Sequence, residues 1–366
     1  MRVKLYSPRH PLHPSTCSMG AGGLWMPFHC DDPRTGRWAA ETLDELFTYE
    51  TQGQADGGQE QLVEIVPILK LLEESGRPVS DEPGTDNFGD PEEWTKDPRL
   101  HFQRLSIEKL FQLNKVNRFR LPFKHELIDA GYRYGHLFFP PIVNSPLMLA
   151  HLLEEASKTL EEVDVPSSPA DETREFCESM SDVMDLAATK NCDAVVNCTG
   201  LGSRQLCQDN EVLGARGILL NFERTELGRR EPNGDEANRK DIAIMAESGP
   251  WASETMPCYM IPRGSRIVVG GSYLEEDGCQ TITQEERAQL FRNAFHLGID
   301  LDKSRPVQQW VGFRPYRPMV RCQVDPNYIG SSIKLIHNYG HGGSGWTVNV
   351  GAAKECASLV QEALQG

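Results

Sequence analysis

Three arginines stand close together in a proline-rich stretch, residues 313–321, at Arg314, Arg317 and Arg321. The two prolines between them exclude a helix and favour a stiff, extended backbone. A guanidinium presents a planar fork of donors that matches a carboxylate, and in a chain with net negative charge this stretch is a local cationic site. We expect Arg314 to bind a substrate carboxylate. For Arg317 and Arg321 an alternative stays open, namely structural ion pairs between parts of the fold.

A glycine-rich turn near the C-terminus, Gly-His-Gly-Gly-Ser-Gly at residues 340–345, stands between a predicted strand and a predicted helix. Its spacing satisfies the dinucleotide-binding pattern G-x-G-x-x-G. That fold needs a further strand after the helix, ending in an acid for the ribose, and the sequence as given ends before such a strand. We therefore expect these glycines to let a different ligand approach the backbone closely. The helix N-terminus behind them would offer N–H groups to an electron-rich atom of that ligand. The alternative is a tight structural turn.

Two other segments are rich in glycine. Residues 195–202 run from an apolar strand into Thr-Gly-Leu-Gly, and residues 19–27 read Met-Gly-Ala-Gly-Gly-Leu-Trp-Met-Pro. Glycines of this kind let a ligand lie against the backbone, and the second segment would suit a flat ring. Each segment taken alone is equally compatible with an ordinary glycine turn.

The composition excludes several classes of protein. The 366 residues carry 37 Lys+Arg against 53 Asp+Glu, a net charge of −16. This charge disfavours phosphate backbones and anionic membrane surfaces, so we expect neither nucleic acid nor a membrane as partner. No apolar stretch approaches the roughly 20 residues of a spanning helix, and no secretory signal is evident. None of the ten cysteines falls two or three residues from another, so no metal site is expected.

The elements that must position these motifs alternate between helix and strand early and late in the chain, and are mainly strands between residues 217 and 271. We predict helices over residues 37–48, 145–160, 183–188, 283–297 and 347–364. We predict strands over residues 3–6, 194–198, 218–220, 242–244, 259–261, 267–269 and 333–337. Ser145 is the predicted N-cap of its helix, and Thr283 with Glu286 a capping box. Surface loops are predicted over residues 51–61 and 79–97, and a turn-rich insertion over residues 164–171.

Four segments, taken together and in this order, are specific. They are residues 21–25 (Ala-Gly-Gly-Leu-Trp), 196–200 (Val-Asn-Cys-Thr-Gly), 312–318 (Gly-Phe-Arg-Pro-Tyr-Arg-Pro) and 338–347 (Asn-Tyr-Gly-His-Gly-Gly-Ser-Gly-Trp-Thr). The set resembles the family of D-amino-acid oxidases and D-aspartate oxidases, over most of the chain. The resemblance implies noncovalently held FAD, hydride transfer from the Cα of a D-amino acid to flavin N5, and reoxidation by dioxygen to give hydrogen peroxide. The imino acid then hydrolyses to a 2-oxo acid and ammonia.

The resemblance also implies roles for single residues. Arg314 would pair bidentately with the substrate carboxylate, Tyr259 would hydrogen-bond the same group, and the carbonyl of Gly343 would receive the substrate amine. These contacts would orient the Cα–H without any side-chain base. The implied cofactor-binding residues are Gly22, Gly23 and Leu24 at one edge of the ring, Cys198, Thr199 and Gly200 near the middle of the cofactor, and Gly342, Gly345, Trp346 and Thr347 around the pyrimidine edge.

The fold implied by the resemblance is α/β: a Rossmann-like FAD-binding layer interleaved with a mixed β-sheet substrate domain, and incomplete at its N-terminus. The FAD-binding domain would comprise residues 1–50, 142–215 and 325–366, and the substrate domain residues 51–141 and 216–324. The family opens with a strand, a G-x-G-x-x-G turn and a helix that hold the pyrophosphate, whereas this sequence begins on what would be the second strand. We therefore expect the chain as given to bind FAD weakly or not at all.

Two alternatives to an active oxidase stay open. One is a catalytically inactive, truncated relative that persists as a binding protein, which is favoured by Thr255, where the family would have a second active-site tyrosine. The other is a relative that oxidises glycine or sarcosine.

The expected partners are a small D-amino acid and dioxygen, and a homodimer is compatible with the sequence. The run Arg-Pro-Tyr-Arg-Pro at residues 314–318 leans toward the D-aspartate branch, but neutral and acidic substrates both stay open. A cytoplasmic location is expected. The final Leu-Gln-Gly lacks a Ser-Lys-Leu type signal, so peroxisomal import by that route is not supported.

Overall fold

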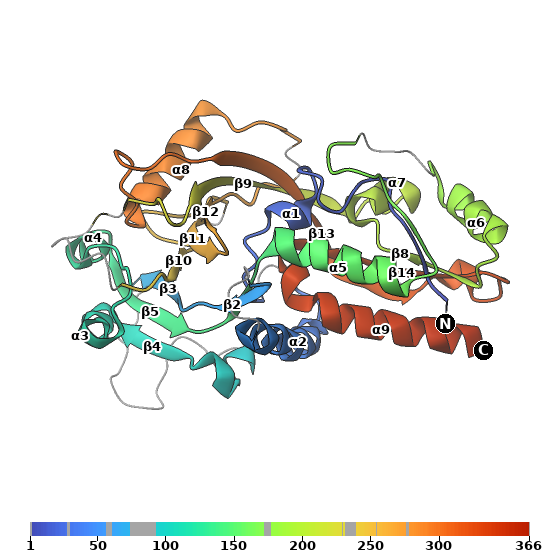
Figure 1. The fold of residues 1–366 in the computed structure, drawn as a ribbon, viewed down its shortest axis with the longest axis horizontal. Helices are drawn as coiled ribbons and strands as arrows, with labels where there is room; N and C mark the ends of the chain where they lie inside the picture. The colour runs from blue at the N-terminus through green and yellow to red at the C-terminus, as the bar shows by residue number, and fades with distance from the viewer. Residues whose placement is uncertain are drawn as a thin grey trace.

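A mixed sheet of ten strands runs through the computed structural model, in the spatial order β4-β5-β3-β10-β11-β12-β9-β13-β14-β8 (Figure 1). Its strands are β3 (Ile68–Glu73), β4 (Gln103–Ser106), β5 (Tyr132–Phe138), β8 (Ala194–Asn197), β9 (Leu213–Glu223), β10 (Ala243–Ala246), β11 (Cys258–Arg263), β12 (Arg266–Gly270), β13 (Gln308–Val324) and β14 (Lys334–His341). The structure describes residues 2–27, 30–55, 61–73, 93–171, 177–228, 230, 239–253, 255–275 and 278–365. The predicted α/β class with a mixed sheet is confirmed.

Two smaller sheets have two strands each. β1 (Lys4–Tyr6) pairs in parallel with β7 (Glu162–Asp164), and β2 (Val63–Ile65) pairs antiparallel with β6 (Pro141–Val143). β8 pairs in parallel with β14 and ends the large sheet at one edge. One prediction is wrong here: Asp164, assigned to a turn-rich insertion, ends a strand because it pairs with Tyr6 of β1.

All five predicted helices are present. The α-helices are α1 (Cys17–Gly20), α2 (Thr35–Ala55), α3 (Ile107–Asn117), α4 (Lys124–Asp129), α5 (Ser145–Thr159), α6 (Met180–Thr189), α7 (Ser203–Leu206), α8 (Gln284–His296) and α9 (Gly345–Gln365). Short 3-10 helices are η1 (Glu93–Lys96), η2 (Pro98–Leu100), η3 (Gly200–Gly202), η5 (Pro326–Tyr328) and η6 (Gly342–Ser344). The capping box of α8 is confirmed, because the Thr283 hydroxyl accepts from the Glu286 N–H at 3.2 Å and the Glu286 carboxylate accepts from the Thr283 N–H at 2.8 Å.

Three other details of the predicted elements are wrong. Asn144, not Ser145, occupies the N-cap of α5, because the Ser145 hydroxyl instead donates to the carbonyl of Ala21 at 3.0 Å. α2 continues to Ala55 through the start of the predicted loop 51–61, and the Thr51 hydroxyl donates to the Phe47 carbonyl one turn earlier at 2.9 Å. Residues 93–96 form η1 rather than loop. Residues 56–60 and 79–92 of the two predicted loops lie outside the described residues.

α9 is fixed against α2 by a close backbone contact. A Cβ placed on Gly351 of α9 would lie 2.3 Å from the Cα of Trp38, whose side chain is fully buried. Glu355, one turn further along α9, accepts from the Trp38 indole at 2.8 Å and from Arg34 at 3.0 Å. These contacts hold α9 against α2.

Two sets of buried hydrophobic residues account for most of the core. One cluster packs β3, β5, β9, β11 and β12 against α3 and α8, and includes Leu137, Phe222 and Leu290. The other packs α2 and α9 against β13 and β14, and includes Trp38, Ile336 and Val348. In Figure 1, α2, α5 and α9 lie together beside the β8 and β14 end of the large sheet.

Candidate active site

Arg314 lies on β13, and its guanidinium reaches across β9. Its Nη1 donates to the carbonyl of Ser272 at 2.9 Å. The guanidinium rests directly on the backbone of Gly217, where a Cβ would lie 2.7 Å from Nη2. No carboxylate among the described residues forms an ion pair with Arg314. This arginine is therefore positioned by neutral groups, and its charge is available to a ligand.

Tyr259 on β11 approaches the same guanidinium from the other side of β12. A Cβ on Gly270 would lie 2.4 Å from the Tyr259 hydroxyl, so the phenol packs where β12 carries no side chain. Burial raises the pKa of Tyr259, although the charge and hydrogen bond of Arg314 oppose that rise. The phenol stays protonated at neutral pH and is a donor. Glycines on the two intervening strands, Gly270 on β12 and Gly217 on β9, thus allow these side chains to meet above the sheet.

Tyr273 is a neighbour of Arg314 that the sequence analysis missed. Its ring lies 5.6 Å from the Arg314 guanidinium carbon and packs edge-on against Tyr316. Its backbone N–H donates to the carbonyl of Thr255 at 2.8 Å. Thr255 stands where the resemblance implies a second active-site tyrosine. Tyr273 therefore places a tyrosine directly beside that position. The only signal in the sequence is the run of small residues 270–272 after a strand, which indicates a crowded site but names no partner.

The glycine turn at residues 340–345 joins β14 to α9, as predicted. Gly340 and Gly342 have φ of +96° and +55°, so the turn itself requires them. Gly345, the first residue of α9, is different: a Cβ there meets nothing within 4 Å. The turn does not require this glycine. Gly343 lies in η6 between them, directly before the α9 N-terminus, where the first N–H groups of a helix have no partner within the helix.

The segment with Gly22, Gly23 and Leu24 is held against the start of α9. The Thr347 hydroxyl donates to the Met26 carbonyl at 2.9 Å and accepts from its N–H at 3.2 Å. Gly23 has φ of +76°, and a Cβ there would lie 2.0 Å from the Val143 carbonyl oxygen. Gly22 packs against Ile261, and Leu24 bridges to Ile142. Close packing within the protein therefore accounts for both glycines, although the segment still borders the α9 N-terminus.

The turn Cys198–Thr199–Gly200 follows β8 and lies beside the arginine segment. Gly200 has φ of +56°, and a Cβ there would lie 3.6 Å from the side chain of Pro315. The Thr199 N–H and hydroxyl donate to Asn197 Oδ1 at 3.1 and 2.8 Å. Cys198 is exposed. The turn is thus brought next to the residue that follows Arg314.

Arg317 and Arg321 are used in ion pairs, which confirms the structural alternative for both. The Arg317 guanidinium contacts Asp209 at 3.1 Å and also pairs with Glu211. Arg321 pairs with Asp325 at 3.1 Å and donates to the Tyr339 hydroxyl at 2.8 Å. The guanidinium groups of Arg317 and Arg321 therefore have acidic partners within the protein, unlike that of Arg314 among the described residues.

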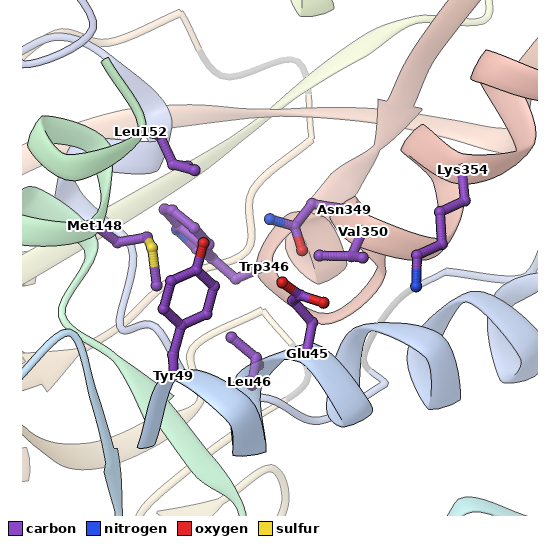
Figure 2. Close-up of a pocket in the computed structure, with 9 residues that line it drawn as sticks. All are labelled: Glu45, Leu46, Tyr49, Met148, Leu152, Trp346, Asn349, Val350 and Lys354. Atoms are coloured by element: carbon purple, nitrogen blue, oxygen red, sulfur yellow. The ribbon is translucent and has the colours of Figure 1, made fainter. Parts of the chain in front are cut away.

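A cavity of about 220 Å³ lies between α2, α5 and α9, and Trp346 turns its indole toward it (Figure 2). Tyr49 of α2 and Met148 of α5 face the indole across this cavity, which also contacts Asn349 of α9. The indole N–H donates to the Ser18 carbonyl at 3.4 Å. With its side chain directed there, Trp346 would contact a ring at the α9 N-terminus through its backbone.

The residues around the α9 N-terminus fit one end of FAD, the polar flat ring. Gly345 faces open space, and the helix N-terminus offers N–H donors. Asn338 Oδ1 and His341 Nε2 on β14 are buried without a hydrogen-bond partner in the described part of the chain, and such atoms need one. Burial lowers the pKa of His341 to about 4, so it is neutral at pH 7. The described residues hold no cluster of metal ligands.

The phosphate end of the cofactor has less to contact. After β8 the chain enters α7, a helix of four residues, which is too short to present a strong N-terminal dipole. α6 has its N-terminus closed by its own capping box of Ser179 and Asp182.

No helix of the described residues is long and apolar enough to cross a membrane.

A large mixed sheet, a glycine turn leading into the last helix and an arginine without an ion pair among the described residues are the features expected of an oxidoreductase that binds a nucleotide cofactor. A family model described as FAD dependent oxidoreductase matches residues 2–359, and the chain belongs to this family. The predicted membership in the family of the D-amino-acid and D-aspartate oxidases, and with it the FAD cofactor, is confirmed.

Curated relatives cover different shares of the chain. A D-amino-acid oxidase of Dictyostelium discoideum is 28% identical over 356 residues, 96% of this chain and 83% of that protein. A D-amino-acid oxidase of Rubrobacter xylanophilus is 31% identical over 245 residues, 66% of this chain and 64% of that protein. A human D-aspartate oxidase is 30% identical over 176 residues, 46% of this chain and 44% of that protein.

Solved structures share the fold. Glycine oxidase from Bacillus cereus superposes with a TM-score of 0.62 at 15% identity, covering 99% of this chain and 91% of that one. Iminodiacetate oxidase from Chelativorans gives 0.61 at 17% identity, covering 96% and 87%. Identities this low establish the fold alone.

Proposed function

We propose that this chain is a FAD-dependent oxidase that deaminates D-amino acids. The observation that carries the proposal is the pair Arg314 and Tyr259, directed at one point above the sheet with no acidic partner among the described residues. A guanidinium held by neutral groups beside a protonated phenol is suited to a carboxylate. The curated relatives named for D-amino acids support the choice of substrate class.

In this proposal the chain's own residues orient the substrate. The fork of Arg314 and the phenol of Tyr259 bind the carboxylate, and the carbonyl of Gly343 accepts a hydrogen bond from the amine. With these two groups fixed, one enantiomer alone presents its Cα–H toward the α9 N-terminus. FAD, when bound, would supply the hydride acceptor and the redox chemistry by which dioxygen is reduced to hydrogen peroxide. The amine proton leaves to solvent, so no side-chain base is needed.

We also propose the finer assignments made from the sequence. The first hydrophobic cluster lies wholly within residues 51–141 and 216–324, which supports a division into a substrate domain of these residues and a FAD-binding domain of residues 1–50, 142–215 and 325–366. The net charge of −16 supports a protein without nucleic-acid or membrane partners. A cytoplasmic location and a homodimer complete the proposal, and size-exclusion chromatography with light scattering tests the dimer.

Peroxide production with enantiomeric substrates tests the proposed function. The purified chain, supplied with excess FAD, is given D-alanine, D-aspartate, their L forms, glycine and sarcosine. Peroxide should appear with a D-amino acid and not with the L forms, while glycine, with a hydrogen on either side, should react slowly. Equal turnover of L-amino acids contradicts the placement of the three anchors.

The remaining outcomes separate the alternatives. Brisk oxidation of sarcosine without a response to D-alanine or D-aspartate identifies a glycine- or sarcosine-type oxidase. FAD binding without turnover of any of these substrates identifies an inactive relative. A flavin-fluorescence titration run beside the assay measures the affinity for FAD.

A further inference from the structure

A buried chain of hydrogen bonds ends at the turn after β8. Asn197 and His337 are 4% and 0% exposed, so neither can exchange its partners for water. Asn197 Oδ1 accepts from the N–H and hydroxyl of Thr199, and Asn197 Nδ2 lies 3.3 Å from His337 Nδ1. The opposite ring nitrogen, His337 Nε2, lies 2.9 Å from the Asp325 carboxylate. This series of hydrogen bonds therefore links the Asp325 carboxylate to the backbone of the turn.

The groups at the two ends of this series, the Thr199 N–H and the Asp325 carboxylate, determine which atom donates in each hydrogen bond. The backbone N–H of Thr199 can only donate, so the amide oxygen of Asn197 must face it and the amide nitrogen must face His337. His337 Nδ1 must then be the unprotonated acceptor, and Nε2–H the donor to Asp325. A protonated His337 would place two donors face to face. Asn197 Nδ2, which also lies 3.2 Å from the Ser203 hydroxyl and 3.2 Å from the Cys207 thiol, would then keep only these two acceptors, and its amide would hold Thr199 less firmly.

The surroundings of His337 keep it neutral. Asp325 favours the protonated ring, while Arg321 opposes it and also pairs with Asp325. Tyr339 packs edge-on against the ring at 5.6 Å, and the Cys207 thiol of α7 lies 4.0 Å from Nδ1. More distantly, Asp209 adds a weak attraction. Burial is the largest influence and lowers the pKa of His337 below its usual value of 6.5.

We propose that His337, acting through Asn197, is a positioning residue that holds the Cys198–Thr199–Gly200 turn in the conformation that receives the middle of the cofactor. This inference rests on the proposed function only for the identity of what the turn binds. It is independent of Arg314 and of catalysis, because none of its contacts involves the substrate anchors.

Two variants of His337 and one control test the positioning role. His337→Leu removes the acceptor, so the Thr199 amide should exchange with deuterium about tenfold faster, measured by hydrogen-exchange mass spectrometry of the peptide spanning residues 194–206. His337→Asn replaces Nδ1 with an amide oxygen at similar reach and should restore slow exchange. The control, His10→Leu, removes another buried histidine, which accepts from the Leu12 N–H at 3.1 Å, and should leave this peptide unchanged.

The pH dependence gives a second readout that a packing role would not produce. Protonation of His337 should release the turn, so exchange of the same peptide, corrected for its intrinsic rate, should rise as the pH falls below about 6.5 toward the lowered pKa. In the His337→Asn variant this rise should disappear. FAD affinity should follow the same order, about tenfold weaker in His337→Leu than in His337→Asn at pH 7.5.

The outcomes separate this inference from the proposed function. Unchanged exchange in His337→Leu, or equal acid sensitivity in His337→Asn, overturns the positioning role. If exchange responds as expected but FAD affinity is the same in every variant, the role in holding the turn stands and its use for FAD is overturned.

Discussion

Replacing Arg314 by lysine tests the proposed carboxylate anchor. The guanidinium already donates from Nη1 to Ser272, which leaves the rest of the fork for two charge-assisted hydrogen bonds to a carboxylate. Lysine keeps the charge but has a single nitrogen, which must also satisfy the Ser272 carbonyl, so one charged hydrogen bond is lost. Such a bond contributes about 2 kcal/mol, so KM for a D-amino acid should rise about 30-fold.

The assay is steady-state peroxide production at saturating FAD, with flavin content measured in parallel. Flavin content should not change, because in the proposed function Arg314 contacts the substrate and not FAD. Arg317→Lys is the matched control on the same strand, and since Arg317 pairs with Asp209 and Glu211 its KM should stay within twofold of wild type. A KM for Arg314→Lys within twofold of wild type would refute the reasoning and assign Arg314 to the structure of the sheet.

Three further predictions concern the phenol, the helix N-terminus and acid stability. Tyr259→Phe should raise KM about fivefold through the loss of one hydrogen bond, measured in the same assay. Gly345→Ala should raise Tm, because the added Cβ meets nothing within 4 Å, and should weaken FAD binding in a fluorescence titration. The control Gly36→Ala, at an equally open position at the start of α2, should raise Tm without changing FAD binding. Burial alone would raise the pKa of Asp32, but Arg34, bound at 2.8 and 2.9 Å, lowers it below 3.8. This pair therefore stabilises the fold above that pKa and is lost as the pH falls through it, so Asp32→Asn should lower Tm at pH 7 and flatten the decline of Tm from pH 5 to 3.

Helices and the class of fold could be predicted from the sequence because their signals are local. Apolar residues at helical spacing and the Thr283 capping box place α8 correctly, since every group in that signal lies within one turn. The N-cap of α5 could not be placed in this way. Ser145 is a residue type that often caps helices, but its hydroxyl donates to the carbonyl of Ala21, which is distant in sequence.

The candidate site was predictable where one residue type matches one ligand, and not where a partner comes from elsewhere. The ion pairs of Arg317 and Arg321 could not be placed from the sequence, because the acids that bind them lie in the loop after α7 and at the end of β13. Tyr273 carries no periodic or motif signal. Its relation to Arg314 depends on strand order in the sheet, which a single sequence does not determine.

One irregularity in β13 separates the two uses of its arginines. Up to Tyr316 the strand pairs with β9, and its pairing with β14 shifts register between Tyr316 and Arg321, where Pro318 has no N–H to donate. The first half therefore carries Arg314 over β9, toward Tyr259 and the predicted substrate. The second half directs Arg321 to Asp325, the carboxylate that also accepts from His337. A single strand thus carries both the proposed carboxylate anchor and Arg321, which pairs with Asp325, so a shift of β13 along its own axis should disturb the proposed substrate and cofactor sites together.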